Sequence, residues 1–205
     1  SLAELRLATG ALLLSGGSQL TGKVNVAADA RLQLGARDGT THELVALNGW
    51  GSEGKLGIGA GSLVNTSGDS YYLGTLELSD GLLNVGGSLY VSGFEMTGGD
   101  LKGDGSFRAA SRFLWNSGRF QGSGATLFSG EANLSGPGEK LVDQRRIEFT
   151  GTTTWTGGVI KVSGNGRFDN RGSFLDQRNA GQMLRTQGMP EGGSFIRMGA
   201  PAESF

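Results

Sequence analysis

The single histidine is the first residue to consider, because a Ser-His-Asp triad or a histidine metal site would depend on it. His42 lies in the polar stretch Gly39-Thr-Thr-His-Glu-Leu. We expect it to be a solvated loop residue rather than a catalytic base. One histidine cannot form a histidine cluster around a metal. The chain has no cysteine, which excludes a zinc–thiolate site, a disulfide framework and a thiol nucleophile.

Carboxylates are the next candidates, since glycoside cleavage needs a pair of them on one face. The sequence offers four but does not bring any two together: Asp143, Glu148, Asp169 and Asp176. A different acidic pair lies in the glycine-rich stretch from Gly98 to Ser106 and superficially resembles calcium-binding nonapeptides. These two are Asp100 and Asp104. Their spacing does not match, so we interpret them as turn residues that bond to local backbone. We predict no catalytic, metal-binding or cofactor-binding residue and no enzyme.

Three tryptophans could stack on sugar rings: Trp50, Trp115 and Trp155. The last two occupy the same place in a repeat as Leu78 and Met96, which indicates core or corner packing. The threonine run before Trp155 suggests ice binding, which needs a column of threonines repeated from unit to unit. The equivalent positions before Trp115 hold no threonine. The glycine run from Gly57 lacks the lysine and following helix that phosphate binding needs.

An internal repeat of about 20 residues contains most of these residues. Four segments align without gaps, beginning at Leu78, Met96, Trp115 and Trp155. The 40 residues between the last two starts indicate two units, one of them degenerate. Three positions after each start is a glycine: Gly81, Gly99, Gly118 and Gly158. Two positions further is an apolar residue: Leu83, Leu101, Phe120 and Ile160.

This alternation of apolar and polar residues, interrupted by glycine, is typical of short strands with one buried face. A unit of this kind cannot bury its apolar face alone, whereas stacked copies can. We therefore predict an all-β fold, a parallel β-helix (β-solenoid) of about ten degenerate rungs. The alternative is an antiparallel β-sandwich, which glycine-rich turns would also suit. Few Asn-Gly hairpin turns and the 18–20-residue period favour the solenoid.

We interpret residues 1–205 as a single solenoid segment that belongs to a longer repeat protein. Residues 1–72 are the less regular rungs, and residues 73–205 carry the clear repeats. Polar stretches at residues 37–43, 136–140 and 178–190 are candidate loops. No stretch shows a helical apolar stripe over three turns, so we predict no long helix.

Composition narrows the possible partners. The chain has 39 glycines among 205 residues, without collagen periodicity, and 37% hydrophobic residues, which is enough for a core. Its 18 basic and 19 acidic residues give a net charge of −1. Such a balance offers no attraction to nucleic acid. No run of 18 apolar residues is present, so we expect no membrane insertion.

The stretch from Trp155 to Phe174 resembles the Trp/Gly repeats of large bacterial exported β-helix proteins, the haemagglutinin-like and autotransporter-passenger adhesins. The resemblance covers residues 73–205. It implies a right-handed parallel β-helix, an extracellular or cell-surface location, and a role as adhesin, filament module or stalk. Copies of the chain, neighbouring repeats, or a carbohydrate or cell-surface ligand are the expected partners. The alternative function is that of a polysaccharide-binding or polysaccharide-cleaving β-helix.

Overall fold

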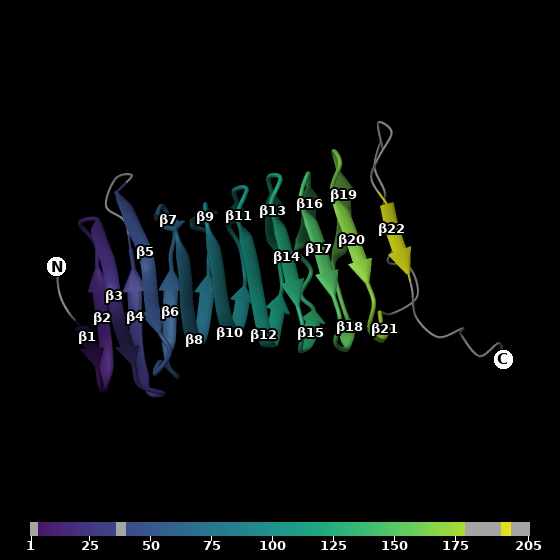
Figure 1. Cartoon of the computed structure of the whole chain (residues 1–205). Coiled ribbons are helices and arrows are strands. Elements are labelled where there is room, and N and C mark those ends of the chain that lie inside the picture. The colour runs from purple at the N-terminus through teal and green to yellow at the C-terminus, as the bar shows by residue number, and fades with distance from the viewer. Residues whose placement is uncertain (1–3, 36–39, 179–193, 198–205) are drawn as a thin grey trace.

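The computed structural model describes residues 4–35, 40–178 and 194–197. Within these ranges the chain forms strands, turns and loops and contains no helix. All strand pairings there are parallel, which is the arrangement of a β-solenoid and excludes the antiparallel sandwich. Figure 1 shows the strands side by side along a rod, with β1 (Glu4–Leu7) at one end and β22 (Ser194–Arg197) at the other.

Each turn of the solenoid has three faces, so that every third strand segment stacks on its equivalent in the next turn. The first face contains the opening halves of β3 and β5 and six whole strands: β7 (Leu63–Ser67), β9 (Leu82–Val85), β11 (Asp100–Lys102), β13 (Gly118–Gln121), β16 (Glu139–Asp143) and β19 (Val159–Ser163).

The second face begins with β1 and ends with β22, and three of its long strands bend around the corner into the third face. Its ten strands are β1 (Glu4–Leu7), β3 (Ser18–Val26), β5 (Thr41–Gly49), β8 (Asp69–Leu78), β10 (Ser88–Met96), β12 (Ser106–Trp115), β14 (Ala125–Phe128), β17 (Arg146–Phe149), β20 (Arg167–Asn170) and β22 (Ser194–Arg197).

The third face combines the closing halves of β8, β10 and β12 with six short strands. These are β2 (Gly10–Leu14), β4 (Ala30–Leu34), β6 (Lys55–Ile58), β15 (Glu131–Leu134), β18 (Thr153–Trp155) and β21 (Phe174–Asp176). Eight turns have strands on all three faces, and one partial turn lies at each end. The ten strands of the second face therefore agree with the predicted number of rungs, while the complete turns are about eight.

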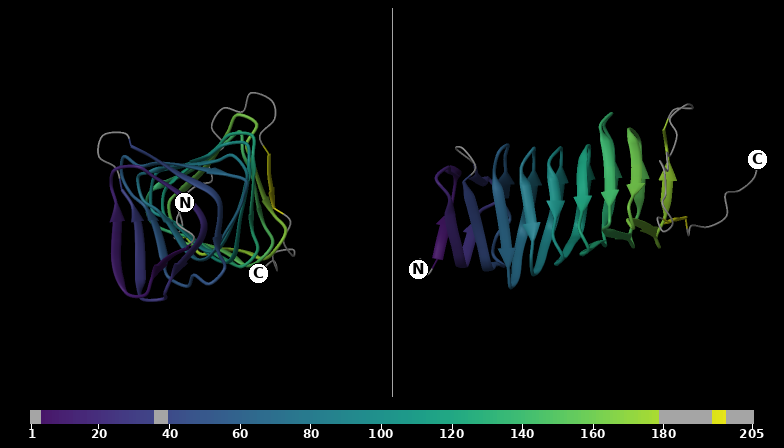
Figure 2. Two further views of the ribbon diagram at one scale, coloured as in Figure 1. Left: turned by 60° about the vertical axis from the view of Figure 1, so that its left-hand side comes forward. Right: turned by 90° about the horizontal axis from the view of Figure 1, so that it is seen from above.

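Apolar residues at alternating positions point into one continuous core, which Figure 2 shows as the space that all turns enclose. The column predicted from the repeat is confirmed: its residues lie in register on the third face, and Leu134 fills the degenerate unit. From turn to turn it comprises Leu78, Met96, Trp115, Leu134 and Trp155. Phenylalanines pack next to it, and the rings of Phe113 and Phe128 are stacked with centroids 3.7 Å apart.

Glycines at the corner before the first face allow successive turns to approach closely. Gly99 has φ +76°, and a Cβ on it would lie 2.3 Å from the carbonyl oxygen of Gly81. That oxygen accepts a hydrogen bond of 2.9 Å from the backbone N–H of Asp100. A side chain at residue 99 would therefore be strained and would push two turns apart.

The register differs from the sequence alignment after the third clear repeat. Phe120 lies opposite Val142, which lies opposite Val162, so Ile160 is not in the column of Phe120. The reason is that the later corners before the first face are longer. Trp115 and Phe120 are 5 residues apart, whereas Leu134 and Val142 are 8 apart and Trp155 and Val162 are 7 apart. Ile160 is buried as predicted, but its neighbour in the turn before is Lys140.

The predicted loops are correct only in part. Residues 41–43 belong to β5, and Glu139 and Lys140 belong to β16. Residues 179–190 of the third predicted loop lie outside the described residues. No helix that could cross a membrane is found in the part of the chain that the structure describes.

Candidate functional site

The structure corrects the expectation for His42, which is fully buried on the first face rather than solvated in a loop. Its Nδ1 lies 2.8 Å from the Ser18 hydroxyl, and its Nε2 lies 2.7 Å from the Gly35 carbonyl oxygen. The carbonyl can only accept, so Nε2 donates to it; in the neutral imidazole Nδ1 then accepts from the Ser18 hydroxyl. The polar sequence around His42 hid its inward position, because outward neighbours in a strand are polar too.

Asp100 and Asp104 do not come together as a metal site. The Asp100 carboxylate pairs with Arg119, at 2.8 Å from Nε and 3.1 Å from Nη2, and Asp104 is exposed in a turn. Across residues 4–35, 40–178 and 194–197, no group of three or more His, Asp or Glu side chains is placed to hold an ion.

Of the four carboxylates considered for glycoside cleavage, the fold brings together only Glu148 and Asp169. They are opposite each other in neighbouring strands of the second face. Asp143 belongs to the first face and Asp176 to the third. Arg146 bonds to both members of the pair, at 2.8 Å from Glu148 and 3.0 Å from Asp169. Arg171 adds a contact of 3.1 Å to Glu148.

The three tryptophans differ in burial, and the two that the repeat places in the core are buried. Trp115 and Trp155 are buried in the core, whereas Trp50 is 58% exposed. Thr153 of the threonine run points inward and Thr154 outward, opposite Asn133 and Leu175. The column of threonines that ice binding requires is thus absent at this place of the third face.

Trp50 begins a ladder of side chains on the outside of the second face. Its indole stacks on Tyr71 with ring centroids 5.2 Å apart and an interplanar angle of 24°. The ring of Tyr71 lies 6.2 Å from that of Tyr90 at 42°. The guanidinium of Arg108 follows, 5.8 Å from the centre of the Tyr90 ring, which is a cation–π distance. Because Tyr71, Tyr90 and Arg108 are register partners, one step of the solenoid separates each from the next.

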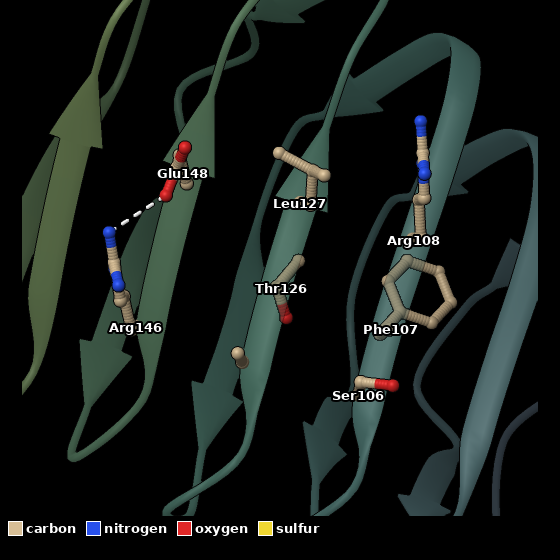
Figure 3. A pocket seen from close by; sticks show the side chains of 8 residues that line it. Ser106, Phe107, Arg108, Thr126, Leu127, Arg146 and Glu148 are labelled. Atoms are coloured by element: carbon tan, nitrogen blue, oxygen red, sulfur yellow. Dashed lines mark hydrogen bonds and ion pairs between the residues drawn. The ribbon is translucent and has the colours of Figure 1, made fainter.

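Beyond Arg108 the same face is hollowed, with a volume of about 250 Å³. Figure 3 shows Arg108, Leu127 and Glu148 beside one another on three neighbouring strands, in agreement with their register. Leu127 is the apolar floor between the two charged residues. The hydroxyl of Ser106 and the side chain of Arg146 complete the rim. This ladder and hollow together are called the lateral face below: Trp50, Tyr71, Tyr90, Arg108, Leu127, Arg146 and Glu148.

The outside of the third face has a different chemistry, a ladder of ion pairs. Glu77 contacts Arg31 and Lys55, and Glu95 lies 3.7 Å from Lys55 and 3.8 Å from Arg112. The hydrogen bond to Glu77 raises the pKa of Lys55. Burial raises the pKa of Glu77, but Lys55 and Arg31 outweigh burial, so the net pKa is lowered. These charges neutralise one another and act as cross-strand pairs.

A second hollow of about 410 Å³ lies further along the third face. Polar side chains line most of it, including Arg112, Asn133, Thr154 and Gln177. Its rim contains no exposed aromatic ring. The lateral face is therefore the better candidate, because it combines an exposed indole, an apolar floor and a cation.

Sequence reasoning found Trp50 as a possible sugar-stacking residue but missed Tyr71, Tyr90 and Arg108. A signal was present in their spacing, since 19 and 18 residues separate them, which is the period of the repeat. The period shows that they stack, but only the register shows that Trp50, which follows β5, reaches the same ladder.

Comparisons with known proteins found no matching family model, no similar curated protein and no similar solved structure. The class that the structure defines is thus a parallel β-solenoid with one distinctive lateral face.

Proposed function

We propose that the chain is a structural and adhesive segment of a large bacterial surface or secreted protein, a stiff rod that presents a lateral face. The observation that carries this proposal is where the repeated residues point. Those that recur from turn to turn are inward, such as Leu78, Met96 and Trp115, or are corner glycines. Outward residues at equivalent positions change type, from Leu82 to Asp100 to Arg119. The repeated residues therefore build the rod, and the outward residues, which vary from turn to turn, are available to recognise a ligand.

Stacked parallel turns suit a stalk. The ten strands of the second face are separated by steps of about 4.8 Å, which gives roughly 43 Å of rod. An extracellular or cell-surface location follows from the resemblance of residues 155–174 to exported adhesin repeats. Copies of the chain or adjoining repeats are the proposed partners at the ends, where strand edges would otherwise be unpaired.

Polysaccharide cleavage is the competing function, and Glu148 and Asp169 are the residues it would use. Glycoside hydrolysis requires one carboxylic acid that can donate a proton. Arginine N–H groups instead occupy all four oxygens of these two carboxylates: Arg146 and Arg171 contact Glu148, and Arg146 and Arg167 contact Asp169. Neither carboxylate has an oxygen left to act on a glycosidic bond. We therefore propose binding without cleavage.

The stalk role is tested by inserting the chain between a membrane anchor and a fluorescent tip on a bacterial surface. The tip should move outward by roughly 40 Å, the length of the stacked turns. The adhesive role is tested with beads coated with the chain, which should adhere to polysaccharide-coated surfaces more than albumin-coated beads do. A folded chain that neither moves the tip nor retains beads would contradict the proposal.

A further inference from the structure

The chemistry of the lateral face changes along the rod axis, and this change restricts the class of ligand that the face can bind. At one end is the exposed indole of Trp50, and the rings of Tyr71 and Tyr90 continue from it. Stacking covers the face of Tyr71 toward Trp50, and Arg108 covers one face of Tyr90, so the exposed indole of Trp50 offers the accessible π face. Such a face is electron-rich and attracts polarised C–H groups. The underside of a sugar ring presents C–H groups of this kind. The aromatic end is therefore suited to sugar rings.

Next to the tyrosines lies a cation, Arg108, that no described residue neutralises. Within the described residues Arg108 forms no ion pair. The Tyr90 ring is the one charged or aromatic group there that its guanidinium contacts. Arg146 is different, because Glu148 and Asp169 already occupy it. Arg108 is also exposed. The guanidinium of Arg108 is thus free to bind a carboxylate by donating two parallel N–H···O hydrogen bonds.

The length of the lateral face favours a chain of sugars over a single one. Register partners connect Tyr71 to Glu148 through Tyr90, Arg108 and Leu127, and Trp50 adds one further step at the indole end. Five steps of about 4.8 Å span roughly 24 Å. The hollow of about 250 Å³ at Leu127 provides room next to Arg108.

An acidic peptide would also offer carboxylates, but the lateral face does not suit a peptide backbone. Peptides in extended form bind by pairing with a free strand edge. The strands of the lateral face are interior to the sheet, because each pairs with the turn before and the turn after. What remains for recognition is ring faces, one guanidinium and hydroxyl groups, such as that of Ser106.

We propose that the lateral face binds a linear polysaccharide that carries carboxylates, with the glycan lying along the rod axis. A sugar ring packs against the exposed indole of Trp50, the glycan passes along the outer edges of the two tyrosines, and a carboxylate pairs with Arg108. This inference rests on the proposed adhesive function and names the ligand class of that function.

The test titrates the full chain with oligogalacturonate and follows tryptophan fluorescence. Trp115 and Trp155 are buried, so a change reports mainly on Trp50. The wild-type chain should bind, and added salt should weaken binding because the contact is ionic. Arg108→Gln should weaken binding about tenfold, which corresponds to about 1.4 kcal/mol, because the charge-assisted hydrogen bonds to the carboxylate are lost. Trp50→Ala, followed by calorimetry because the reporter is lost, should also weaken it.

The control is Arg112→Gln, an exposed arginine on the same strand β12 but on the third face. It should leave the affinity within about twofold of wild type, an energy near RT. Thermal unfolding of each variant shows whether it is folded. Neutral cello-oligosaccharide and oligoglutamate of similar length should bind weakly.

Any one of these results would overturn the inference: no binding of oligogalacturonate by the folded wild type, equal loss in Arg108→Gln and Arg112→Gln, equal binding of the neutral glycan, or equal binding of oligoglutamate. Sialyllactose distinguishes an extended glycan from a terminal acidic sugar, and tighter binding of sialyllactose would also contradict the extended mode. The tip-displacement experiment does not depend on the glycan, so failure of this inference is distinguishable from failure of the stalk role.

Discussion

The guanidinium of Arg145 donates a hydrogen bond of 2.9 Å to the carbonyl oxygen of Gly103, which is 42 residues earlier and two turns away. Arg145 is fully buried at the corner between the first and second faces. It also bonds to the Gly105 carbonyl at 3.0 Å and the Thr126 hydroxyl at 2.8 Å. One side chain therefore connects three successive turns from inside the corner.

Arg145→Met should destabilise the solenoid strongly. It removes the hydrogen bonds that Arg145 donates to four carbonyl oxygens and to the Thr126 hydroxyl. A buried acceptor that loses its donor costs about 1–3 kcal/mol. Burial lowers the pKa of Arg145 to about 10, so the side chain remains charged at neutral pH. Urea unfolding at pH 7 measures the loss. Arg112→Met removes an exposed arginine and should cost less than about 1 kcal/mol. Similar losses in both variants would show that the corner does not depend on Arg145.

Lys140 should make stability rise with pH in the alkaline range. Its ammonium group is buried among the carbonyl oxygens of Asn116, Gly138 and Gly157, at 3.0–3.2 Å. Burial lowers the pKa of Lys140 to about 8, below the usual 10.5. Below pH 8 the folded and unfolded states are both protonated. Between pH 8 and 10.5 the unfolded state binds more protons, so the free energy of unfolding increases with pH.

The increase should reach at most about 1.4 kcal/mol per pH unit. It is measured as the difference between the wild type and Lys140→Met in urea unfolding at pH 7, 8, 9 and 10. The difference should be constant up to pH 8 and then change in favour of the wild type. Lys102→Met, which removes a lysine on the outside of the first face, is the matched control. A flat difference for Lys140→Met up to pH 10 would contradict the lowered pKa.

Gly99→Ala should destabilise the chain because its φ of +76° disfavours a side chain and its Cβ would meet the Gly81 oxygen at 2.3 Å. Backbone strain of this type costs about 1–3 kcal/mol, and displacement of the neighbouring turn adds to it. Thermal unfolding is the measurement. Gly16→Ala provides a control, since a Cβ there meets nothing within 4 Å and φ is not positive. If Gly16→Ala were the more destabilising variant, the corner would not be as tight as the structure shows.

Leu134→Ala tests the register of the degenerate turn. Leu134 is fully buried between Trp115 and Trp155, so its truncation should cost about 2–5 kcal/mol. Leu114→Ala is chemically identical but lies on the outer side of the third face, one turn earlier. Urea unfolding measures both variants, and Leu114→Ala should lower the free energy of unfolding clearly less than Leu134→Ala does. Equal costs would mean that Leu134 does not occupy the core column.

The sequence by itself determined the class of fold and the residues of its repeating core. Glycine spacing and alternation suffice for this, because every turn must bury the same column of side chains against its neighbours. The repeat also separated Trp115 and Trp155, which are buried, from Trp50. The alternation of apolar and polar residues was less informative where the corners differ in length. At one such corner Lys140 lies opposite Ile160, in a column where the alignment predicts an apolar residue.

Only the tertiary structure decided the positions of His42, Lys140 and Arg145, all of which the sequence presents as ordinary polar residues. Each is buried because carbonyl or hydroxyl groups from other turns satisfy it, and those partners are up to 42 residues away. The lateral face is likewise a product of stacking. Trp50, Tyr71, Tyr90 and Arg108 meet because parallel register places residues about 20 apart within one step of each other.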